Sequence, residues 1–116
     1  MDYRYINMSY LDTVTEGNTE LIKEIATIFK EQSVEIYSEM ESLLSEKKYY
    51  LLGLLAHKAK SSVAIMGMDN LASMLKTFEL QAKKGIESEL YESYIERFNT
   101  ETKAAILELE NLVNSL

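Results

Sequence analysis

The absence of proline is the feature that most limits what this chain can fold into. None of its 116 residues is proline, and only four are glycine. Proline breaks helices and central strands and otherwise marks turns, so its absence favours long helices joined by short turns. Gly17, Gly67 and Gly85 each lie between segments whose apolar residues recur every three or four positions. A glycine there ends one helix and lets the next begin, which predicts an all-helical fold.

The spacing of apolar residues predicts four long helices. Asn18 or Thr19 is the expected N-cap of the first, and Asp69 that of the third. The expected segments are a short one from Met8 to Val14, then helices from Asn18 or Thr19 to about Ser45, from about Lys48 to Met66, from Asp69 to Gly85, and from about Glu87 to Asn114. The prediction is an all-α, antiparallel four-helix bundle with a short N-terminal helical segment, in a single domain over residues 1–116.

Composition narrows the class of protein. Apolar residues at 47% and charged residues at 27% are typical of a globular domain and exclude intrinsic disorder. Without cysteine there are no disulfides, thiolate zinc sites or cysteine nucleophiles. The start lacks the basic and apolar regions of a signal peptide, and the longest uncharged apolar run, Tyr49 to Ala56, is too short for a membrane helix. We expect a cytoplasmic protein without membrane contact, and a monomer by default.

Charge is unevenly distributed along the sequence. The net charge of −7 is a poor match for nucleic acid, which requires clustered Lys and Arg. Residues 47–84 nevertheless contain seven lysines and only two acids, Asp69 and Glu79. A basic stretch this local suits an acidic protein partner or a phosphoryl group better than a long polyanion.

His57, the only histidine, lies on the outer face of its predicted helix. At 100° per residue the apolar residues gather opposite the histidine, which predicts that the imidazole points away from the core. The residues predicted to form the buried stripe are Leu51, Leu52, Leu55, Ala59, Ser62, Val63 and Met66. Those predicted to share the face of His57 are Tyr50, Gly53, Leu54, Lys60, Ser61 and Ala64.

The small residues around His57 have two interpretations. A glycine inside a helix costs about 1 kcal/mol relative to alanine, so Gly53 needs a compensating role. With Ser61 and Ala64 it would leave a bare strip on which another molecule could approach the imidazole, and Tyr50 and Leu54 could supply the apolar part of that docking surface. Alternatively, Gly53 allows a tight helix crossing and His57 is an ordinary surface histidine.

Two lysines favour a chemical role for His57. Lys60 is three residues further along the helix, within side-chain reach, and Lys58 flanks the ring from its other side. Cations beside an exposed imidazole would stabilise an anion placed on it. A neutral ring nitrogen that attacks, next to a cation that holds phosphoryl oxygens, is the arrangement that a phosphoryl acceptor needs.

The residues around His57 resemble a known signature. Ala56-His57-Lys58-Ala59-Lys60-Ser61-Ser62, followed by Gly67 and by Phe78-Glu79, is similar to the A-H-x-L-K-G-S-S pattern, with a downstream glycine and L-E, of histidine-containing phosphotransfer (HPt) domains. The similarity extends over essentially the whole chain. Ala59 replaces the usual leucine, which changes packing, and Ser61 replaces a glycine that keeps the surface bare for the partner.

The resemblance implies a place in a two-component phosphorelay. His57 would accept a phosphoryl group from the aspartyl phosphate of a receiver domain on a hybrid sensor kinase and pass it to the receiver domain of a response regulator. Lys60 would contact the phosphoryl oxygens, and Glu79 on the neighbouring helix would help to orient the imidazole. No cofactor is expected on this chain, since Mg²⁺ would be bound by the receiver domain. An initiating methionine favours a free-standing shuttle over a fragment of a hybrid kinase.

Enzyme motifs are missing from the sequence. It contains no G-x-x-x-x-G-K, no G-x-G-x-x-G and no H-E-x-x-H, and one histidine is a poor basis for a metal site. We therefore expect a phosphocarrier with a phosphohistidine intermediate, without kinase activity of its own and without a metal. The alternative is a phosphorylation-inactive helical bundle in which the face of His57 serves only for protein interaction.

Overall fold

The computed structural model describes residues 3–116, all of whose regular structure is helical. Its elements are α1 (Met8–Thr15), α2 (Thr19–Ser45), α3 (Tyr49–Ile65), α4 (Asp69–Lys84), the short 3₁₀ helix η1 (Ser88–Leu90) and α5 (Tyr91–Ser115). The predicted segments are confirmed to within a few residues. The largest difference is at α5, which begins later than expected because η1 occupies the residues before it.

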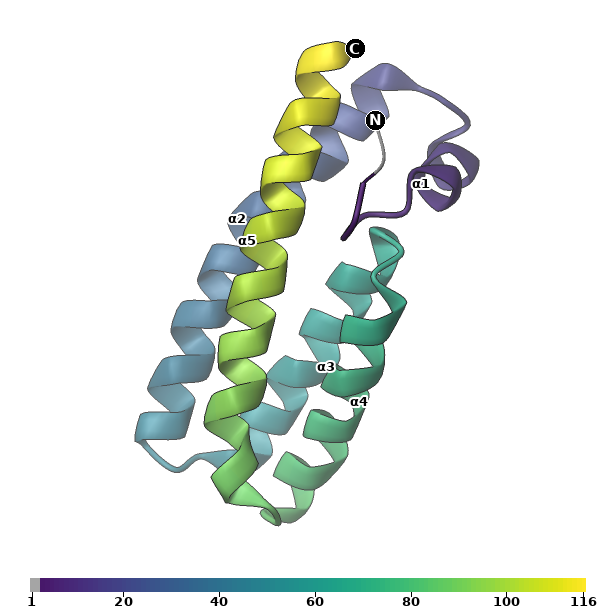
Figure 1. Ribbon diagram of the computed structural model, residues 1–116. Helices are drawn as coiled ribbons and strands as arrows, with labels where there is room; N and C mark the ends of the chain where they lie inside the picture. Colours follow the sequence, from purple (N-terminus) through teal and green to yellow (C-terminus); the bar gives the residue numbers. More distant parts are fainter. Residues whose placement is uncertain (1–2) are drawn as a thin grey trace.

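The four long helices run side by side as an up-and-down bundle (Figure 1). Each helix is antiparallel to the next along the chain, and the molecule measures 43 × 20 × 20 Å. The closest pairings are α3 with α4 and α2 with α5. The short helix α1 lies at one end, near the turn between α3 and α4, as Figure 1 shows. The predicted all-α four-helix bundle is thus confirmed.

Aromatic residues fill the core between α4 and α5. Phe78 and Phe98 have no exposed surface, and neither has Tyr91, whose ring lies 5.4 Å from Phe78 and 5.3 Å from Tyr49. The Tyr91 hydroxyl shares its single proton between the carbonyl oxygens of Gln81 and Ile86, where α4 ends. These contacts fix the C-terminal half of α4, the half that carries Glu79.

Helix ends are formed partly as predicted. The Asn18 side chain caps α2 by accepting a hydrogen bond from the backbone N–H of Leu21, and Gly85 ends α4 with a φ of +66°. The prediction that Asp69 caps α4 is wrong. Asp69 is the first helical residue, and Met68 occupies the cap position without any side-chain hydrogen bond.

The buried face of α3 is turned toward α4 relative to the predicted stripe. Leu51, predicted to be buried, is 47% exposed, whereas Ala56, which was not assigned to the stripe, has no exposed surface. The physical reason is the close packing of α4 on one side of α3, which covers Ala56 and leaves the opposite edge of α3 open.

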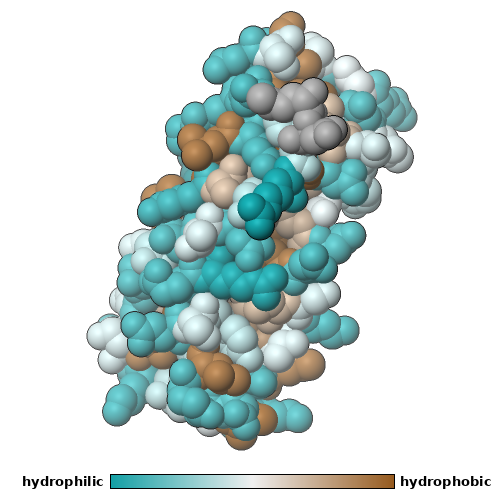
Figure 2. Space-filling model, viewed as in Figure 1, coloured by the Kyte–Doolittle hydropathy of each residue, from teal (hydrophilic) through white to brown (hydrophobic). Residues whose placement is uncertain are grey.

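The surface is mainly hydrophilic on the side viewed in Figure 1, with hydrophobic residues scattered rather than gathered into one patch (Figure 2). Among the helices of residues 3–116, none combines the length and the apolar character needed to cross a membrane.

Candidate functional site

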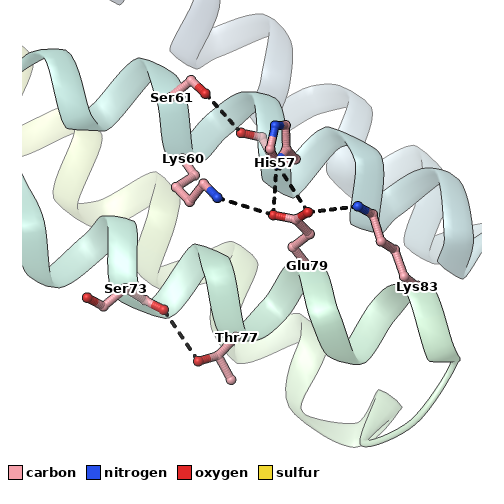
Figure 3. A network of polar contacts seen from close by, with 7 residues as sticks. All are labelled: His57, Lys60, Ser61, Ser73, Thr77, Glu79 and Lys83. Carbon is pink, nitrogen blue, oxygen red and sulfur yellow. Dashed lines mark hydrogen bonds and ion pairs between the residues drawn. The ribbon is translucent and has the colours of Figure 1, made fainter.

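His57 projects from the middle of α3 into solvent. Its side chain is 57% exposed, so the prediction that it points away from the core is confirmed. Nδ1 lies 3.0 and 3.1 Å from the two carboxylate oxygens of Glu79 on α4 (Figure 3). The expected proximity of Glu79 to the imidazole is therefore present, and it fixes one edge of an otherwise exposed ring.

Glu79 is a buried carboxylate surrounded by cations. Its side chain is only 9% exposed, and its oxygens lie 2.7 Å from Nζ of Lys83 and 3.5 Å from Nζ of Lys60. Burial on its own raises the pKa of this carboxyl. The hydrogen bond from Lys83, the hydrogen bond with His57 and the charges of both outweigh burial and lower the pKa to about 2. Glu79 is therefore ionised at neutral pH.

The charge of Glu79 determines which nitrogen of His57 carries the proton. An ionised carboxylate only accepts hydrogen bonds, so Nδ1 must be the donor in this contact. In the neutral ring the free lone pair then belongs to Nε2. No residue within 3–116 forms a hydrogen bond with Nε2, which leaves it as the nitrogen that an incoming molecule can reach.

The two lysines predicted beside His57 occupy different places. Lys60 is 28% exposed and turns toward Glu79, on the α4 side of the imidazole, as Figure 3 shows. Lys58 is exposed, and its helix position places it on the edge of α3 that faces α2. Only Lys60 thus joins the network around Glu79.

Four of the five predicted docking residues lie at the surface near His57. Tyr50 is 59% exposed and Leu54 44%, Ser61 is exposed, and Ala64 is half-buried. The Ser61 hydroxyl points back along α3 and donates a weak hydrogen bond of 3.4 Å to the His57 carbonyl oxygen. A serine here therefore adds little bulk above the ring.

Gly53 is not part of an open surface, so its assignment to partner docking is corrected. It is buried under α4. A Cβ atom at this position would lie 2.8 Å from Cγ of Lys83 and 3.0 Å from both the Glu79 carbonyl oxygen and the Lys83 backbone nitrogen. The alternative interpretation of Gly53, a tight helix crossing, is the one that the structure supports.

Sequence reasoning missed an apolar edge on the α2 side of His57. Leu51 and Ile65 are 47% and 45% exposed, and with Leu54 they follow one edge of α3. Ile65 also lines an apolar groove of about 260 Å³ between α1, α2 and α3, whose other walls include Val14 and Ile28. The available signal was the helical spacing of Leu51, Leu54 and Ile65. Leu51 was assigned to the buried stripe, Leu54 was already predicted as a docking residue, and Ile65 was assigned to neither group.

Lys83 was missed as a site residue. In the sequence it was one of seven lysines of a basic stretch, whereas it makes the shortest contact with Glu79. The signal that could have identified it is the spacing of four residues from Glu79, which on a helix brings a glutamate and a lysine together.

Within residues 3–116, no three or more His, Asp or Glu side chains are grouped so that they could hold a metal ion. Comparisons with models of protein families, with curated proteins and with solved structures find no match for this chain.

Proposed function

We propose that this chain is a histidine phosphotransfer protein of a multistep phosphorelay, with Nε2 of His57 as the phosphoryl acceptor. The observation that carries the proposal is an imidazole exposed to solvent whose Nδ1 is held by a buried, ionised carboxylate. This arrangement gives Nε2 a free lone pair, a fixed direction and open access. A surface histidine without a chemical role does not need a buried carboxylate that fixes its ring and its tautomer.

The proposed reaction requires no proton transfer. The Nε2 lone pair attacks the phosphorus of an aspartyl phosphate in line with the bond to the aspartate oxygen. The N–P bond forms while that P–O bond breaks, and the aspartate leaves as a carboxylate with the electron pair. Nδ1 keeps its proton throughout, and the positive charge that develops on the ring is stabilised by Glu79 at 3.0 Å. A second aspartate reverses the step.

Lys60 would contact the phosphoryl group. Its ammonium lies on the same side of the ring as Glu79, and its distance of 3.5 Å from the carboxylate leaves it loosely held. A phosphoryl group on Nε2 would add negative charge within reach of this side chain. Lys60 would then move from the carboxylate to the phosphoryl oxygens, which stabilises both the transferring group and the phosphohistidine.

The proposed partners are receiver domains, one on a hybrid sensor kinase and one on a response regulator, each with its own Mg²⁺. Exposed apolar residues next to His57, namely Tyr50, Leu54 and Ile65, supply contact area for such a partner. Ser61 and Ala64 allow its backbone to come close. The exposed Lys58 would meet the acidic surface around a receiver aspartate.

Phosphoryl acceptance is tested with phosphoramidate as a small donor. We expect intact-mass measurement to show one added phosphoryl group on the wild type, and we expect mild acid to remove it. His57→Gln should take up none and should stay folded, because the exposed side chain contributes little to packing and the variant alters only the contact with Glu79. Uptake by His57→Gln, or its unfolding, would contradict the proposal.

The same experiment addresses the alternative function. A phosphorylation-inactive interaction module would bind receiver domains through the same face but would gain no acid-labile phosphoryl group from phosphoramidate or from a phosphorylated receiver domain. If neither donor labels the wild type, the interaction module is the better description.

A further inference from the structure

Gly53 lies where α3 and α4 are closest, and the structure shows what occupies the space of its missing side chain. The nearest atoms to a Cβ built there are Cγ of Lys83, at 2.8 Å, and two backbone atoms of α4 at 3.0 Å. In proteins a Cβ atom essentially never lies as close as 2.8 Å to another side-chain atom, and it rarely lies 3.0 Å from a backbone atom. The absent side chain is therefore replaced by the aliphatic stem of Lys83.

The position of its stem directs the Lys83 ammonium toward Glu79. The stem is held against the α3 backbone at Gly53, and Nζ donates a hydrogen bond of 2.7 Å to the second oxygen of Glu79 (Figure 3). Lys83 follows Glu79 by four residues on the same helix, the favourable order for a glutamate and lysine pair. At 32% exposure the contact is partly shielded from solvent, so it is stronger than an ordinary surface ion pair.

Two lysines thus reach one carboxylate from different helices, with different freedom. Lys83 is at 2.7 Å and packed along its stem, whereas Lys60 is at 3.5 Å. Lys60 leaves Glu79 if it moves to a phosphoryl group. If Lys83 were absent as well, the buried Glu79 carboxylate would have only the imidazole as a partner. A buried, poorly paired carboxylate is unfavourable and would turn toward solvent or toward Lys60.

We propose that Lys83 is a positioning residue, which holds Glu79 on Nδ1 of His57 and so leaves Lys60 available to the phosphoryl group, and that Gly53 provides the space for the Lys83 stem. The effect on the imidazole follows from the contacts alone. The effect on phosphoryl uptake rests on the proposed function.

The first measurement is the tautomer of His57, read from the ¹⁵N chemical shifts of its two ring nitrogens. The wild type should hold the proton on Nδ1. In Lys83→Met, which keeps the stem and removes the ammonium, we expect the preference for Nδ1–H to fall about tenfold, the factor that corresponds to one charge-assisted hydrogen bond. Lys83→Arg should restore it.

Lys84→Met is the matched control. Lys84 is the next residue of α4 and is exposed, so its replacement removes the same charge without touching Glu79. This variant should keep the wild-type tautomer. Gly53→Ala tests the other half of the proposal: its Cβ would displace the Lys83 stem, and the Nδ1–H preference should fall as in Lys83→Met. If Gly53→Ala does not fold, Lys83→Met and Lys83→Arg decide the question.

The second measurement is the rate of phosphoryl uptake from phosphoramidate, expected to fall about tenfold in Lys83→Met and to stay unchanged in Lys84→Met. An unchanged tautomer in Lys83→Met overturns the positioning role, even if uptake falls, because Lys83 would then act on the phosphoryl group directly. A changed tautomer in a protein whose wild type accepts no phosphoryl group supports the positioning role and refutes the proposed function.

Discussion

The pairing of His57 with Glu79 joins residues 22 positions apart. Helical periodicity placed the histidine outside the bundle, and the resemblance placed the glutamate beside it. The contact of Lys83 with Glu79 had a signal in the sequence, their spacing of four residues on one helix. Which of the two interpretations of Gly53 holds could not be decided in this way, because it depends on how closely α4 approaches α3. A helical wheel gives the directions in which side chains leave one helix, and it contains no information on the distance between two helices.

Glu79 should make the free energy of unfolding depend on pH between about 4.5 and 2. Its pKa of about 2 in the folded state lies below the ordinary 4.5, so the folded protein releases the proton more readily than the unfolded chain. The stabilisation is complete above about pH 4.5 and is lost as the pH falls through about 2. At neutral pH we expect Glu79→Gln to reduce the free energy of unfolding by roughly 1 to 3 kcal/mol.

Chemical denaturation of Glu79→Gln and of the wild type, from neutral pH down to about pH 2, tests the predicted pH dependence. The difference in the free energy of unfolding between them should be constant above about pH 4.5 and should shrink toward pH 2. Glu92→Gln, on the first turn of α5, supplies the same charge change at an exposed position. A difference that persists unchanged at pH 2 would mean that the glutamate side chain acts through packing rather than through its charge.

At the scale of helices, the turn between α3 and α4 is tied to the start of the chain. Gly67 has a φ of +73°, as expected for a glycine that ends a helix. A Cβ atom at Gly67 would also lie 2.5 Å from Cβ of Asn7, whose backbone N–H donates a hydrogen bond of 3.0 Å to the Met66 carbonyl oxygen. The segment before α1 therefore closes over this turn.

Gly67→Ala should be strongly destabilising. It imposes strain from the left-handed backbone and pushes Asn7 away, which we expect to reduce the free energy of unfolding by roughly 1 to 3 kcal/mol. Gly17→Ala is the matched control, because Gly17 has a nearly equal φ of +72° but open space around the position of a Cβ. Urea denaturation of both variants separates strain from contact. Equal losses in the two would show that the packing of Asn7 on the turn contributes nothing.

Most helix boundaries could be predicted, and the exceptions have a common physical basis. Glycine marked three turns correctly, but the turn before α3 places Lys47 at a φ of +57° and the turn before α5 places Glu87 at the same value. A lysine or a glutamate has no propensity that would mark such a conformation in the sequence. The delayed start of α5 was missed for this reason.

At the scale of the whole molecule, charge separates by helix pair. α2 carries six glutamates and two lysines, and α5 carries five glutamates with one arginine and one lysine. α3 has two lysines and no acid, and α4 has three lysines against Asp69 and Glu79. Because α3 packs against α4 and α2 against α5, the half of the bundle that carries His57 is basic and the other half acidic. The sequence indicated the basic stretch, and the fold gathers it on one hairpin.

If the chain binds a receiver domain as proposed, this separation predicts that their association is steered by charge, through a subset of the lysines. Lys60 and Lys83 are engaged with Glu79, so they are unsuitable for testing long-range attraction. Replacing Lys48, Lys76 and Lys84 by glutamine lowers the net charge from −7 to −10 and leaves the network intact. The test partner is an isolated receiver domain that exchanges phosphoryl groups with the wild type. We expect this triple variant to associate with it about three- to tenfold more slowly than the wild type at low ionic strength.

The location of the lysines matters in this prediction, not only their number. A second variant, with Lys23, Lys30 and Lys103 on α2 and α5 changed to glutamine, has the same net charge but loses it from the acidic half. The association rate measured by stopped flow should fall much less for this variant. Added salt should make the association rates of the wild type and both variants equal, because screening removes steering over distances beyond about 10 Å. If both triple variants slow equally, the net charge governs association and the basic hairpin has no directing role.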